Sequence, residues 1–177
     1  YPLHTAYSFP DLPGAGKEID LAIPFAQNYV LLKGAAAQKD SVLKYIENAD
    51  LVYFATHGMA SDEDPKNKCF LVLSGQDPFF TAKNIMDCRN LFKKFPEMVI
   101  LSACQTGLGK SMEAGVAGLA RSFMLAGAHH IIMSLWNVDD EATAFLMNRF
   151  IIHLQEPHRF MPSEPLRQAL IDTRAKF

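Results

Sequence analysis

Two uninterrupted apolar runs constrain the fold of this chain more than any other feature of its sequence. The runs are residues 51–55 (LVYFA) and residues 98–101 (MVIL), and neither contains a charged residue. Continuous apolar runs of this length are typical of strands that are covered on both faces, as in a parallel sheet. Each run leads into small and polar residues, at 56–58 (THG) and 102–104 (SAC). The sequence therefore predicts buried strands with polar groups at their carboxyl ends.

Segments with helical spacing of apolar residues lie between the predicted strands. We expect helices at residues 17–27, 38–48, 82–87 with Thr81 as N-cap, 113–125, 139 to about 154, and from about 164 to the end. We expect further strands at residues 29–32, 70–73 and 128–135, the second of them in a hairpin or at an edge. Strands and helices that alternate in this way predict a three-layer α/β/α sandwich built on a mostly parallel sheet. Residues 1–16, rich in Pro and Gly, are predicted as an irregular lead-in segment, and residues 17–177 as the domain.

Composition and charge exclude several classes of function. The chain has 177 residues, 17 basic against 19 acidic side chains and 49% hydrophobic residues, which fits one globular domain. No basic stripe is present, so no nucleic-acid partner is predicted, and no apolar run reaches the roughly 18 residues of a membrane span. The start at Tyr1 shows no signal-peptide pattern, which predicts a domain excised from a longer protein. Three widely spaced cysteines predict neither a disulfide framework nor a zinc site, and favour a cytoplasmic setting.

Three chemistry-bearing residues follow predicted strands. His57, Cys104 and Asp139 each come after an apolar run, and the carboxyl ends of parallel strands meet at one edge of a sheet. An imidazole beside a thiol can take its proton and so create a nucleophile at neutral pH. Attack on a carbonyl needs donors for the oxyanion, and the backbone N–H groups of Gly58 and Cys104 are the candidates.

Structural explanations compete with each of these assignments. A single Cys after an apolar strand is most often a small buried hydrophobe, the interpretation that we adopt for Cys69 and Cys88. A His beside a Gly is usually a structural hydrogen-bonding group. Asp139 and Asp140 open a predicted helix, where carboxylates cap the chain and complement the helix dipole as readily as they bind a ligand.

Several segments resemble one protein family, the CHAT domain. They are residues 55–58 (ATHG), 101–107 (LSACQTG), 115–123 (GVAGLARSF), 126–128 (AGA) and 134–143 (SLWNVDDEAT). The resemblance runs in family order from residues 12–18 (LPGAGKE) to residues 165–169 (PLRQA). That family belongs with the caspase-like and separase-like cysteine peptidases, so the resemblance implies a fold of the caspase-haemoglobinase type.

The resemblance also implies a function. It makes His57 and Cys104 a catalytic dyad of a cysteine endopeptidase, acting on a protein or peptide substrate without a metal or organic cofactor. Relatives in the metacaspase and separase branches use an acidic pocket for a basic residue before the scissile bond, and Asp139 or Asp140 would supply that charge here. Members of the family often follow tetratricopeptide or other helical repeats, which makes such a region the expected partner in cis or in trans.

Two other functions remain open from the sequence. A catalytically latent CHAT-type module would serve in signalling by docking with helical-repeat partners, and an unreactive Cys104 would distinguish it from a peptidase. A thiol redox sensor at Cys104 would need a resolving thiol. The resemblance has two departures, Ala114 where the family usually has Gly and a charged loop after His57, and neither touches the dyad.

Overall fold

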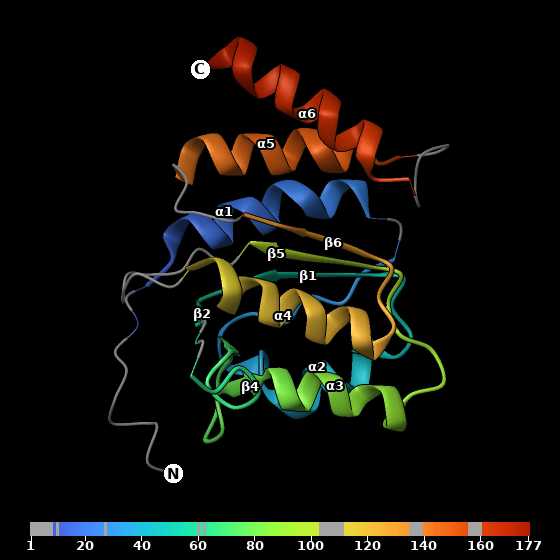
Figure 1. Cartoon of the computed structure of the whole chain (residues 1–177). Coiled ribbons are helices and arrows are strands. Elements are labelled where there is room, and N and C mark those ends of the chain that lie inside the picture. The colour runs from blue at the N-terminus through green and yellow to red at the C-terminus, as the bar shows by residue number, and fades with distance from the viewer. Residues whose placement is uncertain are drawn as a thin grey trace.

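Two three-stranded sheets and six α-helices make up the part of the chain that the computed structural model describes (Figure 1). That part is residues 9, 11–26, 28–59, 61, 63–102, 112–134, 140–155 and 161–177, with only the backbone of residues 13, 112–117 and 140. In chain order the elements are α1 (Pro13–Ala22), the short 3-10 helices η1 (Ile23–Phe25) and η2 (Gly34–Ala36), α2 (Lys39–Ile46), β1 (Leu51–Ala55), β2 (Gly58–Met59), β3 (Phe70–Val72), β4 (Phe79–Thr81), α3 (Ala82–Leu91), β5 (Met98–Ser102), α4 (Met112–Ala126), β6 (His130–Met133), α5 (Asp140–His153) and α6 (Ser163–Lys176).

The first sheet is parallel and has the order β1-β5-β6. The strand β5 therefore lies in the middle, and it pairs with β1 from Leu51↔Met98 to Ala55↔Ser102. On its other side β5 pairs with β6 from Met98↔His130 to Leu101↔Met133. The two apolar runs of the sequence are thus neighbouring strands, as the prediction of a buried parallel sheet requires.

The second sheet is antiparallel, with the order β2-β3-β4, and it follows β1 in the chain. The predicted hairpin at residues 70–73 is confirmed by the pairing of β3 with β4. Thr81 ends β4 and caps α3, because its side chain accepts a hydrogen bond from the backbone N–H of Asn84 while the Asn84 side chain accepts one from the Thr81 N–H. This reciprocal capping satisfies donors that the first helical turn leaves without partners.

Two hydrophobic cores cover the two faces of the parallel sheet. One core contains Met98 and Ile100 of β5 with side chains of α5, and Ala22 of α1 packs against it. The other contains Val99 and Leu101 of the same strand, with side chains of α2, α3 and α4. In Figure 1, α1 and α5 lie on one side of the strands, α6 lies outside α5, and α4 lies on the opposite side. The expected α/β/α sandwich with a parallel sheet is confirmed, because alternate residues of each strand face opposite layers.

Two sequence-based expectations near the N-terminal end are wrong. Residues 29–32 form no strand and are not buried: the side chains of Tyr29 and Val30 are 58% and 56% exposed. This apolar run lies along a cavity beside β1 and forms no ladder with it, and only Leu32 packs against a core, partly buried. The helix expected from Lys17 begins at Pro13, since proline is well suited to the first helical turn, where its missing N–H has no partner to lose.

Among the described residues, no helix combines the length and the apolar content that crossing a membrane requires.

Candidate functional site

His57 lies two residues beyond the carboxyl end of β1 and directly before β2, so in the chain it connects the two sheets. His57 is only 6% exposed. The centroids of the Phe9 and His57 rings lie 5.2 Å apart, and the two ring planes are tilted by 34°. The His57 carbonyl oxygen accepts a hydrogen bond of 2.8 Å from the backbone N–H of Val72 in β3. The neighbouring Thr56 hydroxyl donates to the Val72 carbonyl at 2.5 Å. The imidazole is therefore held by backbone that is fixed on both sides.

Gly58 opens β2 directly after this histidine. It faces Leu71 in the antiparallel ladder, and the adjacent His57 and Val72 form the hydrogen-bonded pair. In such a ladder, bonded and non-bonded pairs alternate, so the N–H of Gly58 points away from β3. The role of Gly58 as an oxyanion donor stays a prediction.

Two of the predicted site residues lie outside the described residues. Cys104 and Asp139 are among the positions that the structure does not describe, and for Asp140 only the backbone is described, as the first residue of α5. Ser102, two residues before Cys104, is the last residue of β5 and pairs with Ala55, two residues before His57. The described ends of the two strands that precede the cysteine and the histidine in the chain therefore lie side by side.

A buried carboxylate in α1 joins these two strands. Glu18 is 6% exposed, and its Oε2 accepts a hydrogen bond of 2.8 Å from the Ser102 hydroxyl at the end of β5. Its Oε1 accepts a short hydrogen bond from the Tyr53 hydroxyl in β1. Burial, and then the negative charge of Glu18, raise the pKa of Tyr53 well above its usual range, so this hydroxyl stays protonated as a donor.

Sequence analysis did not identify Glu18 as a functional residue, although a signal was present. The residue lies on the same side of α1 as Ala15 and Ala22, at the i−3 and i+4 positions, and Ala22 packs against the core. A charged residue on the apolar side of a helix needs a partner when it is buried. Its partners Tyr53 and Ser102 could not be named, because they lie 35 and 84 residues away in the chain.

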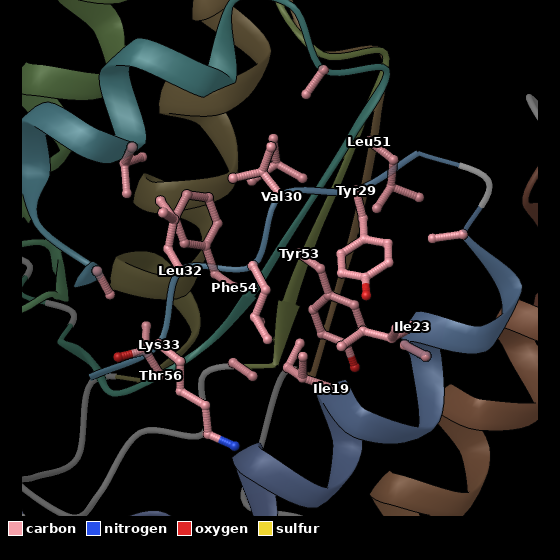
Figure 2. A pocket seen from close by; sticks show the side chains of 18 of the residues that line it. Ile19, Ile23, Tyr29, Val30, Leu32, Lys33, Leu51, Tyr53, Phe54 and Thr56 are labelled. Atoms are coloured by element: carbon pink, nitrogen blue, oxygen red, sulfur yellow. The ribbon is translucent and has the colours of Figure 1, made fainter. Parts of the chain in front are cut away.

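A cavity of about 1210 Å³ lies between α1, residues 28–34 and β1, and its lining extends to His57. Figure 2 shows Ile19 of α1 and Ile23 of η1 on one side of it, with Tyr29 and Val30 of the following segment and Tyr53 of β1 around it. Most labelled lining side chains are apolar, and Lys33 and the tyrosine hydroxyls add polar groups. Such a lining suits apolar groups of a ligand better than charged ones.

Neither of the two described cysteines follows the carboxyl end of β1 or β5. Cys69 is buried beside Ser61 and accepts a hydrogen bond of 3.2 Å from the Ser61 N–H, and Cys88 is buried in α3. Burial, with a contribution from the adjacent Asp87, raises the pKa of the Cys88 thiol to about 11. Both fit the prediction of structural cysteines. Across the described ranges, no group of three or more His, Cys, Asp or Glu side chains is arranged to hold a metal ion.

Comparison with known proteins gives a family match over nearly the whole chain. The profile of the CHAT domain matches residues 2–176. Among curated proteins, tetratricopeptide repeat protein 28 of Homo sapiens is 26% identical over 150 residues, and that of Mus musculus is 24% identical over 150 residues. Each alignment covers 67% of this chain, and the chain spans only about 6% of the length of these relatives. No solved structure matches the chain significantly.

Proposed function

The chain belongs to the CHAT domain family, a member of the caspase-like cysteine peptidase clan, and on that premise we propose that it is a cysteine endopeptidase with His57 and Cys104 as its dyad. One observation carries the proposal. His57 and Cys104 each come two residues after one paired position, Ala55↔Ser102, of two adjacent parallel strands. Neighbouring strands run about 4.8 Å apart, so the two residues continue from neighbouring points of the sheet edge.

The proposed reaction uses only these two side chains, backbone donors and water. His57 takes the proton of the Cys104 thiol, and the thiolate attacks the carbonyl carbon of the scissile peptide bond. The N–H of Gly58, which points away from β3, and that of Cys104 stabilise the oxyanion. The carbon–nitrogen bond then breaks as His57 returns its proton to the leaving amine. Water hydrolyses the resulting thioester, which regenerates the thiol and releases the new carboxylate.

The order of the strands also supports the proposed preference for Arg or Lys before the cleaved bond. The cysteine follows the middle strand β5, the histidine follows β1 on one side, and Asp139 and Asp140 follow β6 on the other. A carboxylate there would pair with a guanidinium or an ammonium group of the substrate. A preference for Asp would need basic side chains in that position instead.

Cleavage of a peptide panel tests the reaction directly. Peptides that differ only in the residue before the scissile bond, with Arg, Lys, Asp, Leu or Gln, are incubated with the wild type and with Cys104→Ala. We expect cleavage after Arg and Lys that disappears in Cys104→Ala and in His57→Ala. Cys88→Ala and His129→Ala are matched controls, because Cys88 is a buried structural thiol and His129 is an exposed residue paired with Glu97. Full cleavage by Cys104→Ala would overturn the assignment, and preferred cleavage after Asp would overturn the specificity.

One observation favours a second candidate, a latent module that docks with helical-repeat partners. The ring of Phe9 lies against His57, and the residue is almost completely buried. The two relatives that this chain matches are named for tetratricopeptide repeats. If no peptide is cleaved and the reactivity of Cys104 does not depend on His57, this second function replaces the first.

A further inference from the structure

We propose that Glu18 is a positioning residue for the dyad: by holding the Ser102 hydroxyl, it fixes the carboxyl end of β5, from which the chain continues to Cys104. This inference rests on the proposed function. Glu18 comes 86 residues before the cysteine in the chain. Only the packing of α1 on the sheet brings its side chain to the end of β5.

The hydrogen bond between Glu18 and Ser102 is of a kind that constrains geometry strongly. It joins a carboxylate oxygen to a hydroxyl at 2.8 Å, and the carboxylate is almost fully buried. Hydrogen bonds with an ionised partner are shorter and stronger than neutral ones, and burial increases the cost of breaking them. The end of β5 is thus attached to α1 as well as to β1.

The position of Ser102 makes this attachment relevant to the cysteine. Among the described residues, Ser102 and Ala55 form the last pair of the β1–β5 ladder, and Cys104 follows Ser102 by two residues in the chain. A side-chain hydrogen bond at the end of a strand adds a constraint to those of the backbone ladder. The Glu18 bond acts on the last paired residue, so its loss would loosen the path into the cysteine segment.

The second oxygen of Glu18 provides a matched comparison. It accepts a hydrogen bond from Tyr53, which pairs with Ile100, two rungs before the end of the ladder. Losing the Tyr53 hydroxyl also leaves a buried carboxylate with one donor fewer, and so has a similar cost in stability. The two rungs that follow Tyr53 continue to hold the end of β1. A positioning role therefore predicts different effects on the dyad from two similar deletions, whereas a purely structural role predicts equal ones.

The test measures alkylation of Cys104 by iodoacetamide across pH 5 to 9, followed by peptide mass mapping of the whole chain. The variants are Ser102→Ala and Tyr53→Phe, each of which removes one hydroxyl, and Ser102→Thr, which retains it; none of them removes an apolar side chain from either core. We expect Ser102→Ala to slow alkylation at pH 7 by about tenfold and to move its pH profile toward that of an ordinary thiol. Ser102→Thr keeps a hydroxyl on the strand and should restore the wild-type rate. Tyr53→Phe should stay within about threefold of it. Cys88 gives a slow internal reference in every sample.

Glu18→Gln tests the carboxylate itself. The amide keeps the size of the side chain, but only its oxygen accepts, so one of the two hydroxyl bonds must reverse or break. We expect a Cys104 rate between those of the wild type and Ser102→Ala. Thermal melts of all variants confirm that each is folded at the temperature of the assay.

The outcomes separate this inference from the proposed function. If wild-type Cys104 reacts no faster than an ordinary thiol and ignores His57→Ala, the dyad does not exist and both proposals fail. If wild-type Cys104 reacts fast and depends on His57, but Ser102→Ala and Tyr53→Phe have equal effects, the peptidase proposal stands and the positioning role is overturned. A rate in Ser102→Thr as low as that in Ser102→Ala would also overturn it, because the hydroxyl would then not be the cause.

Discussion

The contact between Phe9 and His57 decides how accessible the imidazole is. The two rings lie 5.2 Å apart, and His57 is 6% exposed. We predict that Phe9→Ala raises the rate at which diethyl pyrocarbonate modifies His57 by several fold, because removal of the ring opens one side of the imidazole. The rate is measured by peptide mass mapping, and the exposed His129 serves as an internal reference.

Phe9→Tyr is the matched control for that experiment, since it keeps an aromatic ring in the same place. We expect it to leave the modification rate of His57 unchanged. An equal rate in the wild type and in Phe9→Ala would show that the backbone and not the Phe9 ring shields the histidine. A faster rate in Phe9→Ala would show that the accessibility of His57 depends on Phe9, a residue that belongs to none of the sequence motifs.

At the residue scale, the sequence gives the candidate site residues but not the side chains that contact them. The apolar runs and the short motifs after them were sufficient to predict where His57 comes in the fold. The contacts of Glu18 and Phe9 could not be predicted, because they depend on how α1 and the preceding residues pack on the sheet. Packing brings together residues that are far apart in the chain, and local periodicity carries no information about such pairs.

The helices α5 and α6 are joined by a polar cluster centred on Asp172. Its Oδ2 lies 2.8 Å from His153 Nε2 and accepts a hydrogen bond of 2.7 Å from Arg149 Nε. These bonds, that from His153 foremost, lower the pKa of Asp172 from 3.8 to about 2. The carboxylate is therefore held in its charged form by groups of the neighbouring helix.

We predict a defined pH dependence for this cluster. Because the pKa of Asp172 is lower in the folded state, its stabilising effect is fully present above about pH 4 and is lost as the pH falls toward 2. The difference in melting temperature between the wild type and Asp172→Asn should follow that course in circular dichroism melts. Asp87→Asn, which removes an exposed i,i+4 pair with Lys83, is the control and should change the melting temperature little. A difference that is constant between pH 2 and 5 would contradict the prediction.

Most elements of the fold were predictable because their signals are local. The strand at residues 98–101 and the cap at Thr81 followed from apolar runs and capping chemistry. The prediction of a strand at residues 29–32 was wrong. An apolar run does not show whether it will form hydrogen bonds with the edge strand of a sheet. In the structure, a cavity separates that run from β1. The start of α1 was missed because Pro13 was interpreted as a helix breaker, although proline is favourable in the first turn.

The whole molecule is held together by one sheet that two cores share. Val99 and Ile100 are adjacent in β5 and face opposite layers, so neither core can be lost without exposing the strands of the other. Phe123 of α4 is fully buried on one side, with ring contacts to Phe54 at 5.8 Å, and Phe150 of α5 is fully buried on the other. This arrangement predicts that the described layers unfold as one unit.

We therefore predict that Phe123→Ala and Phe150→Ala have the same kind of effect, although the side chains lie in different layers. Each should lower the free energy of unfolding by about 3–5 kcal/mol and should shift a single transition. Chemical denaturation followed by circular dichroism measures the change, and native-state hydrogen exchange measures its extent. Each variant should reduce the protection of amides in both α4 and α5. Leu91→Ala, at a position that is 66% exposed, is the control and should have little effect. If Phe150→Ala reduces protection in α5 while the amides of α4 keep theirs, the two layers are separate cooperative units. In that case the carboxyl ends of β1 and β5 do not depend on the packing of α5.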